Sequence, residues 1–200
     1  MKKKRALVIQ AGGESLRMGQ DKALAPFRGQ PLILRLVERL SDLADELLVT
    51  TNHPENLAPI LSLPLVPDLL PGRGALGGLY TALDAAHAPR VAVVACDMPF
   101  ASAALLEAQF AWLEESEADL VVPCTAAGLE PFHAVYRRAT CLPFVQEALG
   151  RGKRRVDSWF DQARLRYVSP GEIARYDPGG LAFLNVNTPE ELKAAEELHE

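Results

Sequence analysis

Short apolar runs that alternate with helically spaced segments constrain the fold of this chain more than any other feature. Arg5–Gln10 (RALVIQ) and Val91–Ala95 (VAVVA) are typical of strands buried on both faces, because they are short, apolar and rich in β-branched residues. Between them, Pro31–Leu43 carries apolar residues at helical spacing, and Ala75–Ala86 predicts a second helix behind a glycine-rich entry. Strands that alternate with helices predict a mostly parallel sheet covered on both faces.

The rest of the chain continues this alternation. Further strands are expected over Glu46–Thr50, Asp119–Pro123, Glu130–Tyr136, Leu165–Val168 and Ala182–Leu184, with an irregular extended segment over Leu63–Pro67. Further helices are expected over Ser102–Glu115, Cys141–Leu149 and Val156–Phe160, and a last helix begins at Pro189 behind the capping residue Thr188. Because no internal repeat, low-complexity tract or linker is visible, we expect residues 1–200 to form a single domain.

Composition excludes several classes of protein. Of the 200 residues, 48% are hydrophobic and 24% are charged, which is ordinary for a globular chain and argues against disorder. The net charge of −5 gives no support to general nucleic-acid binding, although a small anionic ligand needs only local positive charge. No stretch approaches the ~20 apolar residues of a membrane span. With no signal-peptide pattern and three cysteines at scattered positions, we expect a cytoplasmic protein with reduced thiols and no nucleic-acid or membrane partner.

A glycine-rich segment, Ala11–Lys22 (AGGESLRMGQDK), follows the first predicted strand. Ligands of parallel sheets bind beyond the carboxyl ends of the strands, where glycines expose backbone N–H groups to anions. Arg17 and Lys22 add positive charge, so the segment suits a phosphate chain. It matches neither the Walker A pattern nor G-x-G-x-x-G, which argues against a P-loop protein or a dinucleotide-binding dehydrogenase. The plainer interpretation is a glycine-rich turn with charges on its surface.

Asp97 directly follows the buried strand Val91–Ala95 and could hold Mg²⁺ beside phosphates, because Mg²⁺ takes one or two carboxylates and completes its shell with phosphate oxygens. The alternative is an aspartate that accepts backbone N–H bonds in a turn. Asp68 precedes a run of glycines at positions 72–78, in which Gly77 and Gly78 fall inside a helical pattern. Their cost in a helix is explained by the close approach of a ligand or another helix, or by tight helix–sheet packing.

Three further features are ambiguous by themselves. Asn52 follows the second predicted strand, and Asn185 and Asn187 precede the last helix, where the second asparagine could simply help to make the turn. The basic run Arg151–Arg155 is typical of a solvated face. No sequence pattern of a catalytic triad or of a zinc protease is present.

Taken together, these residues resemble a known family. The segment AGGESLRMGQDK resembles the AGG-x-S-x-R-M-G-x-D-K loop of the molybdenum cofactor guanylyltransferase (MobA) family. The resemblance continues in order through Pro31-Leu32, Asn52, Asp68, the glycines at 72–78, Cys96-Asp97-Met98-Pro99 and Asn185–Glu191 (NVNTPEE), and so spans nearly the whole chain. Two features distinguish this branch from the sugar nucleotidyltransferases. One is Asp21-Lys22, where those enzymes commonly have Pro-Lys, and the other is the terminal motif NVNTPEE.

The resemblance implies a fold and a reaction. The fold would be a Rossmann-like three-layer α/β sandwich of the nucleotide-diphospho-sugar transferase type. The reaction would transfer GMP from GTP to the terminal phosphate of molybdopterin with the help of Mg²⁺, and transient contact with molybdenum insertion proteins and molybdoenzymes would follow from it. By family pattern, the GTP-binding residues would be Gln10, Ala11, Gly12, Gly13, Lys22, Asn52, Asp68, Gly78 and Asp97. Asp97 would also bind the metal, and Asn185 and Asn187 would lie toward the pterin. Gln10 departs from the leucine that the family often has there.

Charge predicts the mechanism. A phosphate monoester is ionised near pH 7, so the nucleophile needs little help from a base, and catalysis consists of positioning and neutralisation by Lys22, Arg17 and Asp97-bound Mg²⁺. Two alternatives of the same fold use CTP on molybdopterin or act on a sugar phosphate. An alternative of another class is a non-catalytic nucleotide-binding protein, against which Asp97 argues, because a binding protein has no need of a metal carboxylate at that strand end.

Overall fold

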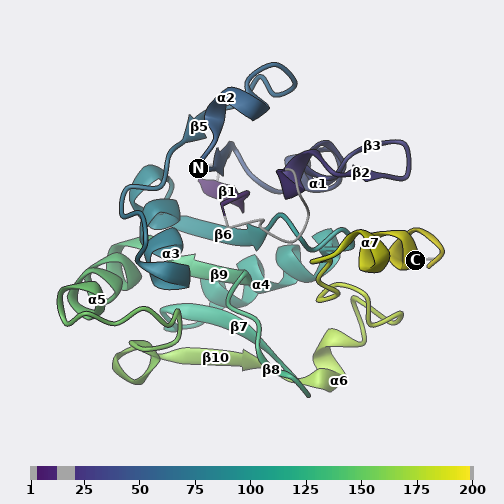
Figure 1. Cartoon of the computed structure of the whole chain (residues 1–200). Coiled ribbons are helices and arrows are strands. Elements are labelled where there is room, and N and C mark those ends of the chain that lie inside the picture. The colour runs from purple at the N-terminus through teal and green to yellow at the C-terminus, as the bar shows by residue number, and fades with distance from the viewer. Residues whose placement is uncertain (1–3, 13–20, 199–200) are drawn as a thin grey trace.

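A sheet in which all but one of the main strands are parallel forms the centre of the structure (Figure 1). The computed structural model describes residues 4–12 and 21–198, so Gly13 and Arg17 lie outside the described residues. The strand order is β10-β7-β9-β6-β1-β4-β5, and β8 pairs with the end of β7. The strands are β1 (Arg5–Gln10), β4 (Glu46–Thr50), β5 (Leu65–Val66), β6 (Arg90–Ala95), β7 (Leu120–Thr125), β8 (Gly128–Leu129), β9 (His133–Arg137) and β10 (Leu165–Val168).

The central strand β1 lies between β4 and β6 and is parallel to both. Its last residue, Gln10, is in register with Thr50 and Ala95, so three strands end at the same edge of the sheet. The exception to the parallel pattern is β9, which is antiparallel to β6 and to β7. The connection from β7 to β9 is a short hairpin segment, whereas a parallel pair needs a crossover of about a dozen residues or more.

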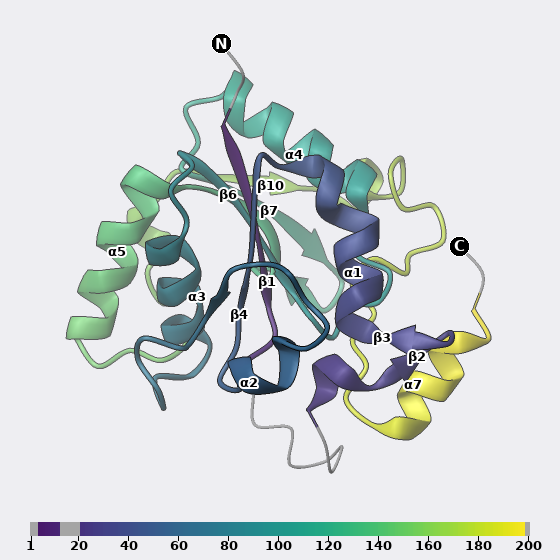
Figure 2. The ribbon, with the colours of Figure 1, turned by 90° about the horizontal axis from the view of Figure 1, so that it is seen from above.

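Helices cover both faces of the sheet, as Figure 2 shows from above. On one face lie α1 (Leu32–Leu40) and α4 (Ala103–Glu115), and on the other lie α3 (Gly74–Ala85) and α5 (Arg138–Gly150). Side chains of β1 alternate between these layers: Leu7 and Ile9 pack into one hydrophobic core, and Ala6 and Val8 pack into the other. The predicted fold class, a three-layer α/β sandwich with a mostly parallel sheet, is confirmed.

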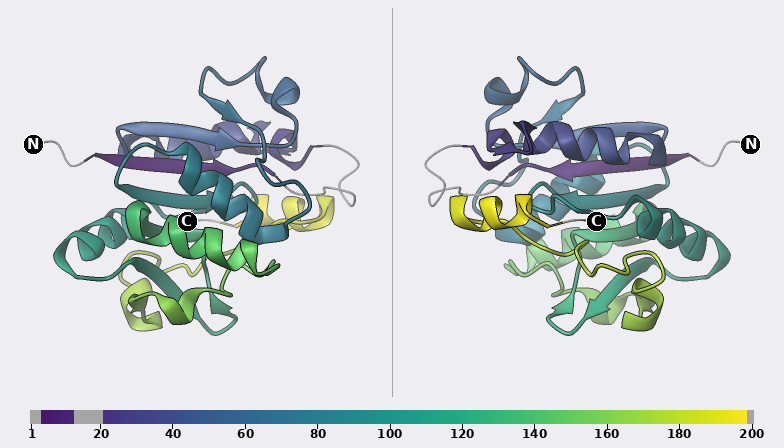
Figure 3. Two further views of the ribbon diagram at one scale, coloured as in Figure 1. Left: turned by 90° about the vertical axis from the view of Figure 1, so that its left-hand side faces the viewer. Right: turned by 90° about the vertical axis from the view of Figure 1, so that its right-hand side faces the viewer.

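Smaller elements lie at the edges of the sheet. Figure 3 shows β5 and α2 (Pro54–Leu57) at one edge, and β10 and α6 (Pro170–Ile173) at the opposite edge. The hairpin of β2 (Pro26–Phe27) and β3 (Gln30–Pro31) packs beside the last helix, α7 (Pro189–Glu196). The predicted cap of α7 is confirmed, since the Thr188 hydroxyl accepts the backbone N–H of Glu191 at 3.1 Å.

Two predicted elements are wrong. Val156–Phe160 is a series of turns, with a short 3-10 helix only at Phe160–Gln162, because Trp159 is drawn fully into an aromatic cluster that needs no helical period. Ala182–Leu184 is a turn instead of a strand, because the Asp177 carboxylate accepts the backbone N–H groups of Leu181 and Ala182. The predicted helix Pro31–Leu43 is also shorter: α1 ends at Leu40 and a 3-10 turn follows.

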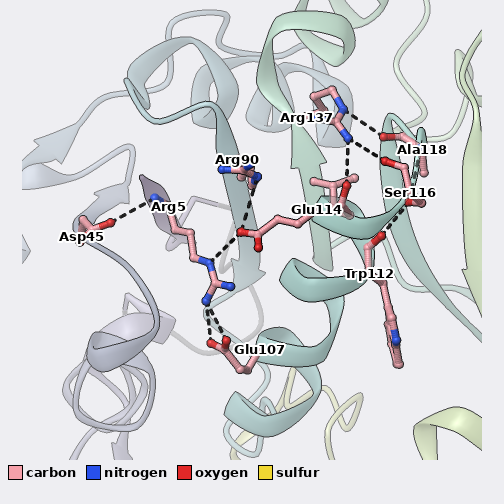
Figure 4. A network of polar contacts seen from close by, with 10 residues as sticks. Arg5, Asp45, Arg90, Glu107, Trp112, Glu114, Ser116, Ala118 and Arg137 are labelled. Atoms are coloured by element: carbon pink, nitrogen blue, oxygen red, sulfur yellow. Dashed lines mark hydrogen bonds and ion pairs between the residues drawn. The ribbon is translucent and has the colours of Figure 1, made fainter. Parts of the chain in front are cut away.

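An ion-pair network joins the amino ends of β1 and β6 to α4 (Figure 4). Arg5 contacts Glu107 at 2.8 Å and Glu114 at 3.4 Å, and Arg90 lies 3.6 Å from the same Glu114 carboxylate. The backbone N–H of Arg5 also donates to Asp45. These residues lie at the amino ends of β1 and β6, away from the carboxyl ends where a ligand is expected. The network therefore anchors α4 without occupying the carboxyl ends.

Within the two described ranges, no helix is both long enough and apolar enough to span a membrane.

Candidate active site

A cavity of about 1030 Å³ opens at the carboxyl ends of β1, β4 and β6. Every predicted site residue that the structure describes lines it: Gln10, Ala11, Gly12, Lys22, Asn52, Asp68, Gly78, Asp97, Asn185 and Asn187. These residues come from segments far apart in the chain, and parallel strands bring their ends to one edge. The volume reaches the upper end of the roughly 300–1,000 Å³ of small-molecule pockets, which suits two substrates bound side by side.

Lys22 and Asp97 form an ion pair in the wall of this cavity. The Lys22 ammonium donates to Asp97 Oδ2 at 3.0 Å and to Asn187 Oδ1 at 2.8 Å. Lys22 begins a 3-10 helix that Asp21 caps by accepting the N–H of Ala23, which fixes the direction in which the lysine leaves the backbone. The sequence separates Lys22 from Asp97 by 75 residues, so only the fold makes them partners.

The asparagine segment is fastened to the same ion pair through the backbone. The N–H of Val186 donates to the carbonyl oxygen of Asp97 at 2.9 Å, which brings Asn185 and Asn187 to the cavity on either side of a fully buried valine. The Glu191 carboxylate accepts the N–H of Asn187 at 2.6 Å and so holds the turn before α7. Asn187 therefore both makes the turn and contacts Lys22.

The site fits one hard cation. Asp97 Oδ1 is buried and has no hydrogen-bond partner among the described residues, so one carboxylate oxygen is available as a ligand. The described ranges contain no cluster of three or more His, Cys, Asp or Glu side chains that could hold a metal by themselves. A single carboxylate suits Mg²⁺, which keeps several waters and takes the rest of its ligands from substrate phosphates.

Asp68 and its neighbours form one half of the cavity, beyond β4 and β5. Asp68 Oδ1 accepts the hydroxyl of the fully buried Thr81 at 2.9 Å and the N–H of Leu70 at 3.0 Å, so the carboxylate is held in place. Asn52 lies beside Gly12, whose backbone approaches the asparagine amide: a Cβ on Gly12 would lie 3.9 Å from Asn52 Nδ2.

The two helical glycines of α3 have different neighbours. A Cβ on Gly77 would lie 2.8 Å from the Cβ of Arg73 and 3.1 Å from the carbonyl oxygen of Leu70. The absence of a side chain at Gly77 therefore lets the turn before α3 pack closely against the helix. A Cβ on Gly78 would lie 3.2 Å from Gln10 Nε2. Neither glycine faces another helix. Close packing against the turn before α3 explains Gly77, and close packing of α3 against Gln10 of β1, at the cavity wall, explains Gly78.

Gln10 places its carboxamide in the cavity, next to Gly78. Its Nε2 atom is buried and has no partner among the residues that the structure describes. The backbone of Gln10 is fixed, because its carbonyl oxygen accepts the N–H of Cys96 at 2.8 Å. The departure from the family pattern therefore adds a hydrogen-bonding group to the cavity wall, where leucine would offer none.

Two charged residues line the cavity that sequence reasoning did not select. The Arg154 guanidinium donates to the carbonyl oxygen of Gly72 at 2.6 Å. The basic run Arg151–Arg155 is exposed throughout, as expected of a solvated face, and Arg154 also lines the cavity. Glu130 precedes β9 and accepts the hydroxyl of Thr125 at 3.2 Å. Burial raises the pKa of the Glu130 carboxyl above its usual range. Arg154 lies in an irregular segment, and Glu130 lies outside β9, which begins at His133 and not at the predicted Glu130. Local sequence gives no signal of what either side chain faces.

The environments of the three cysteines differ. Cys96 and Cys141 are buried, Cys124 is half-buried, and all three are free thiols. Cys96 lines the cavity, but burial and the nearby Asp97 carboxylate raise the pKa of its thiol. The thiol therefore stays protonated and unsuited to act as a nucleophile.

Comparison with known proteins agrees with this geometry. The family model of the MobA-like NTP transferase domain matches residues 7–166. A "Probable molybdenum cofactor guanylyltransferase" from Pelotomaculum thermopropionicum is 37% identical over 94% of this chain and 90% of its own length. A "Molybdenum cofactor guanylyltransferase" from Desulfosudis oleivorans is 32% identical over 94% of this chain and 93% of its own length.

Among solved structures, molybdopterin-guanine dinucleotide biosynthesis protein A from Archaeoglobus fulgidus superposes with a TM-score of 0.84. It is 26% identical to this chain, and the match covers 96% of this chain and 97% of that protein. The agreement therefore extends over the whole sandwich and includes the strand ends that form the cavity. The chain belongs to the MobA-like NTP transferase domain family.

Proposed function

We propose that this protein is a molybdenum cofactor guanylyltransferase, which transfers GMP from GTP to the terminal phosphate of molybdopterin and releases pyrophosphate. The observation that carries the proposal is the Lys22–Asp97 pair, with Asp97 Oδ1 unpaired among the described residues, in the wall of a cavity large enough for two substrates. The names of the relatives favour guanylyl transfer over the cytidylyl and sugar-phosphate alternatives.

The chemistry needs few groups. An oxygen of the acceptor's terminal phosphate attacks the α-phosphorus of GTP, a new phosphorus–oxygen bond forms, and the bond from the α-phosphorus to the oxygen bridging to the β-phosphate breaks. Pyrophosphate leaves with the electron pair of the broken bond. The attacking phosphate is already ionised near pH 7, so no side chain has to remove a proton. The rate then depends on alignment and on neutralisation of the phosphate charge.

Lys22 and Asp97 would supply that neutralisation. Lys22 exchanges its contact with Asp97 for a phosphate oxygen, and Arg17, outside the described residues, adds a second cation by family pattern. Asp97 would hold Mg²⁺ through Oδ1, and the ion supplies positive charge at the phosphates when it is bound. Asn187, which contacts Lys22 at 2.8 Å, keeps the ammonium from turning back toward solvent.

The remaining site residues divide between the substrates. Gln10, Ala11, Gly12, Gly13, Asn52, Asp68 and Gly78 would contact GTP, and Asn185 and Asn187 would face the acceptor. This division has a simple support in the sheet. Asn52 and Asp68 follow β4 and β5 on one side of Asp97, whereas the asparagine segment is bonded to Asp97 itself.

One assay tests the proposal. Each of the four ribonucleoside triphosphates, labelled at the α-phosphate, is supplied with Mg²⁺ and molybdopterin, and the dinucleotide product and pyrophosphate are measured. We expect label from GTP to enter the product. Incorporation of CTP instead would establish the cytidylyl alternative, and binding of GTP without release of pyrophosphate would establish a non-catalytic binding protein.

The same proposal carries expectations about the cellular setting. Three free thiols support a cytoplasmic location. A dinucleotide product that other enzymes use as a cofactor supports transient contact with molybdenum insertion proteins and with molybdoenzymes. Co-purification of the tagged chain with such partners, before and after addition of GTP, measures this contact.

A further inference from the structure

The cavity has a second half, which Glu130 and its neighbours in the chain bound. In the sheet, β9 lies on the opposite side of β6 from β1, and the segment Glu130–Phe132 precedes β9 at the same edge as Asp97. The N–H of Ala95 donates to the carbonyl oxygen of Phe132 at 3.0 Å, which fixes this segment against the end of β6. The Lys22–Asp97 pair therefore lies between two halves, one bounded by Asp68 and the other by Glu130.

Each half presents one carboxylate. Asp68 and Glu130 belong to strand ends four positions apart in the sheet, which corresponds to about 19 Å at about 4.8 Å between neighbouring strands. That span is comparable to the length of an extended dinucleotide. Both carboxylates lie beside a threonine hydroxyl: Thr81 donates to Asp68 at 2.9 Å, and Thr125 Oγ1 lies 3.2 Å from Glu130 and 3.1 Å from the carbonyl oxygen of Gly128.

Glu130 is placed to accept further hydrogen bonds. Thr125 contacts its Oε1 atom, and within residues 4–12 and 21–198 no cation forms an ion pair with Glu130. A half-buried carboxylate with one neutral donor retains most of its acceptor capacity for a ligand. Phe132, which also lines this half, offers a ring against which a flat heterocycle can pack.

This inference rests on the proposed function, whose two substrates carry the same pair of hydrogen-bond donors. Guanine and the pterin of molybdopterin both carry a 2-amino group beside a ring N–H, so both present two parallel N–H donors. Such a pair matches the two oxygens of a carboxylate. A protein that joins the two molecules thus needs the same acceptor twice, once at each end of its cavity.

We propose that Glu130 is a specificity-determining residue that binds the 2-amino and ring N–H donors of the acceptor's pterin, whereas Asp68 serves the guanine of GTP. Guanine is the other possible source of the same donors, so the test separates the two substrates.

The kinetic test compares Glu130→Gln with Asp68→Asn, both close in shape to the natural side chains. We expect Glu130→Gln to raise the KM for molybdopterin at least about tenfold, the loss expected for a charged hydrogen-bond acceptor, while the KM for GTP stays within about twofold. Asp68→Asn should show the reverse. Glu117→Gln is the matched control, because that side chain is 95% exposed and Arg164 lies 3.6 Å from it, away from the cavity.

A second measurement does not need turnover. Pterin and lumazine, which has an oxygen in place of the 2-amino group, are titrated by their fluorescence into the full chain with GTP present. The natural chain should bind pterin more tightly than lumazine, and Glu130→Gln should lose that preference. Equal binding of both by the natural chain, or a KM increase for GTP alone in Glu130→Gln, overturns the assignment. Absence of dinucleotide formation by the natural chain, with the pterin preference intact, would contradict the proposed reaction and leave this assignment standing.

Discussion

Replacement of Lys22 by alanine tests the centre of the site. Its ammonium lies 3.0 Å from Asp97 Oδ2, with 18% of the lysine side chain and 24% of the aspartate side chain exposed. At an effective dielectric constant of about 20, two unit charges 4 Å apart interact by about 4 kcal/mol. A phosphate oxygen that takes the place of Asp97 would gain a contact of this order, and it would be strongest as charge develops on the leaving pyrophosphate.

The expected loss follows from comparison with other fixed donors. Removing one preorganised donor from a developing oxyanion costs about 2.7–4 kcal/mol, so Lys22→Ala should lower kcat by about 100- to 1,000-fold. The fold should survive, because a partly exposed ion pair contributes about 1 kcal/mol or less, which shifts the Tm of a chain of this size by about 2–4 °C. Pyrophosphate release at saturating GTP, Mg²⁺ and acceptor measures the first quantity, and thermal unfolding measures the second.

A matched control separates the site from general charge. Lys193 is exposed on α7, and Lys193→Ala removes the same charge without touching the cavity. Lys22→Arg keeps the charge but changes its geometry, and it should recover only part of the activity. Retention of near-natural kcat/KM by Lys22→Ala would refute the assignment, and a large fall in Tm would show that the lysine is chiefly structural.

Three further predictions follow from single contacts. Asp97→Asn should require a much higher Mg²⁺ concentration for half-maximal activity, since Oδ1 would no longer belong to a carboxylate; a Mg²⁺ titration measures this. Gly77→Ala should destabilise the fold, because its Cβ would lie 2.8 Å from the Cβ of Arg73 and an overpacking cost of about 1–3 kcal/mol exceeds the roughly 1 kcal/mol gained by replacing a helical glycine. Urea unfolding tests it against Gly150→Ala, where a Cβ meets nothing within 4 Å. Burial lowers the pKa of His133 to about 4, so as the pH falls the unfolded chain takes up this proton before the folded chain does. The free energy of unfolding should therefore show no penalty from His133 above pH 6.5 and should fall by about 3 kcal/mol toward pH 4. The difference between the natural chain and His133→Gln in urea unfolding at pH 7.5 and 5.5 isolates this contribution from that of the carboxylates.

Sequence predicts the strands of this fold better than its irregular segments, and the reason is physical. Arg5–Gln10 is buried on both faces, so every residue has to be apolar and the pattern is unmistakable. Val156–Phe160 has apolar residues at helical spacing, but Trp159 is held by contacts with Tyr136 and Phe144, from distant parts of the chain. Such contacts have no local periodicity, so the spacing predicts a helix where the chain forms turns.

The site shows the same division. Lys22, Asp68 and Asp97 could be selected because they follow strands or a glycine-rich segment, positions where a parallel sheet collects its ligands. Glu130 and Arg154 could not, since one lies in a hairpin connection and the other in a charged turn. Sequence does not show which groups become hydrogen-bond partners. That Val186 donates to the Asp97 carbonyl, or Arg154 to the Gly72 carbonyl, is known only from the fold.

The charges that line the cavity argue that the nucleotide does not bind alone. Among the described residues, the cavity carries two cations, Lys22 and Arg154, and three carboxylates, Asp68, Asp97 and Glu130. The described side chains of the cavity carry more negative than positive charge, which disfavours a free triphosphate. Under the proposed function, Asp97 needs a second positive charge once Lys22 turns to the phosphates. Under that function, a divalent cation that arrives with the nucleotide would satisfy both the phosphates and Asp97 Oδ1, so the same carboxylate would favour the nucleotide in its metal complex.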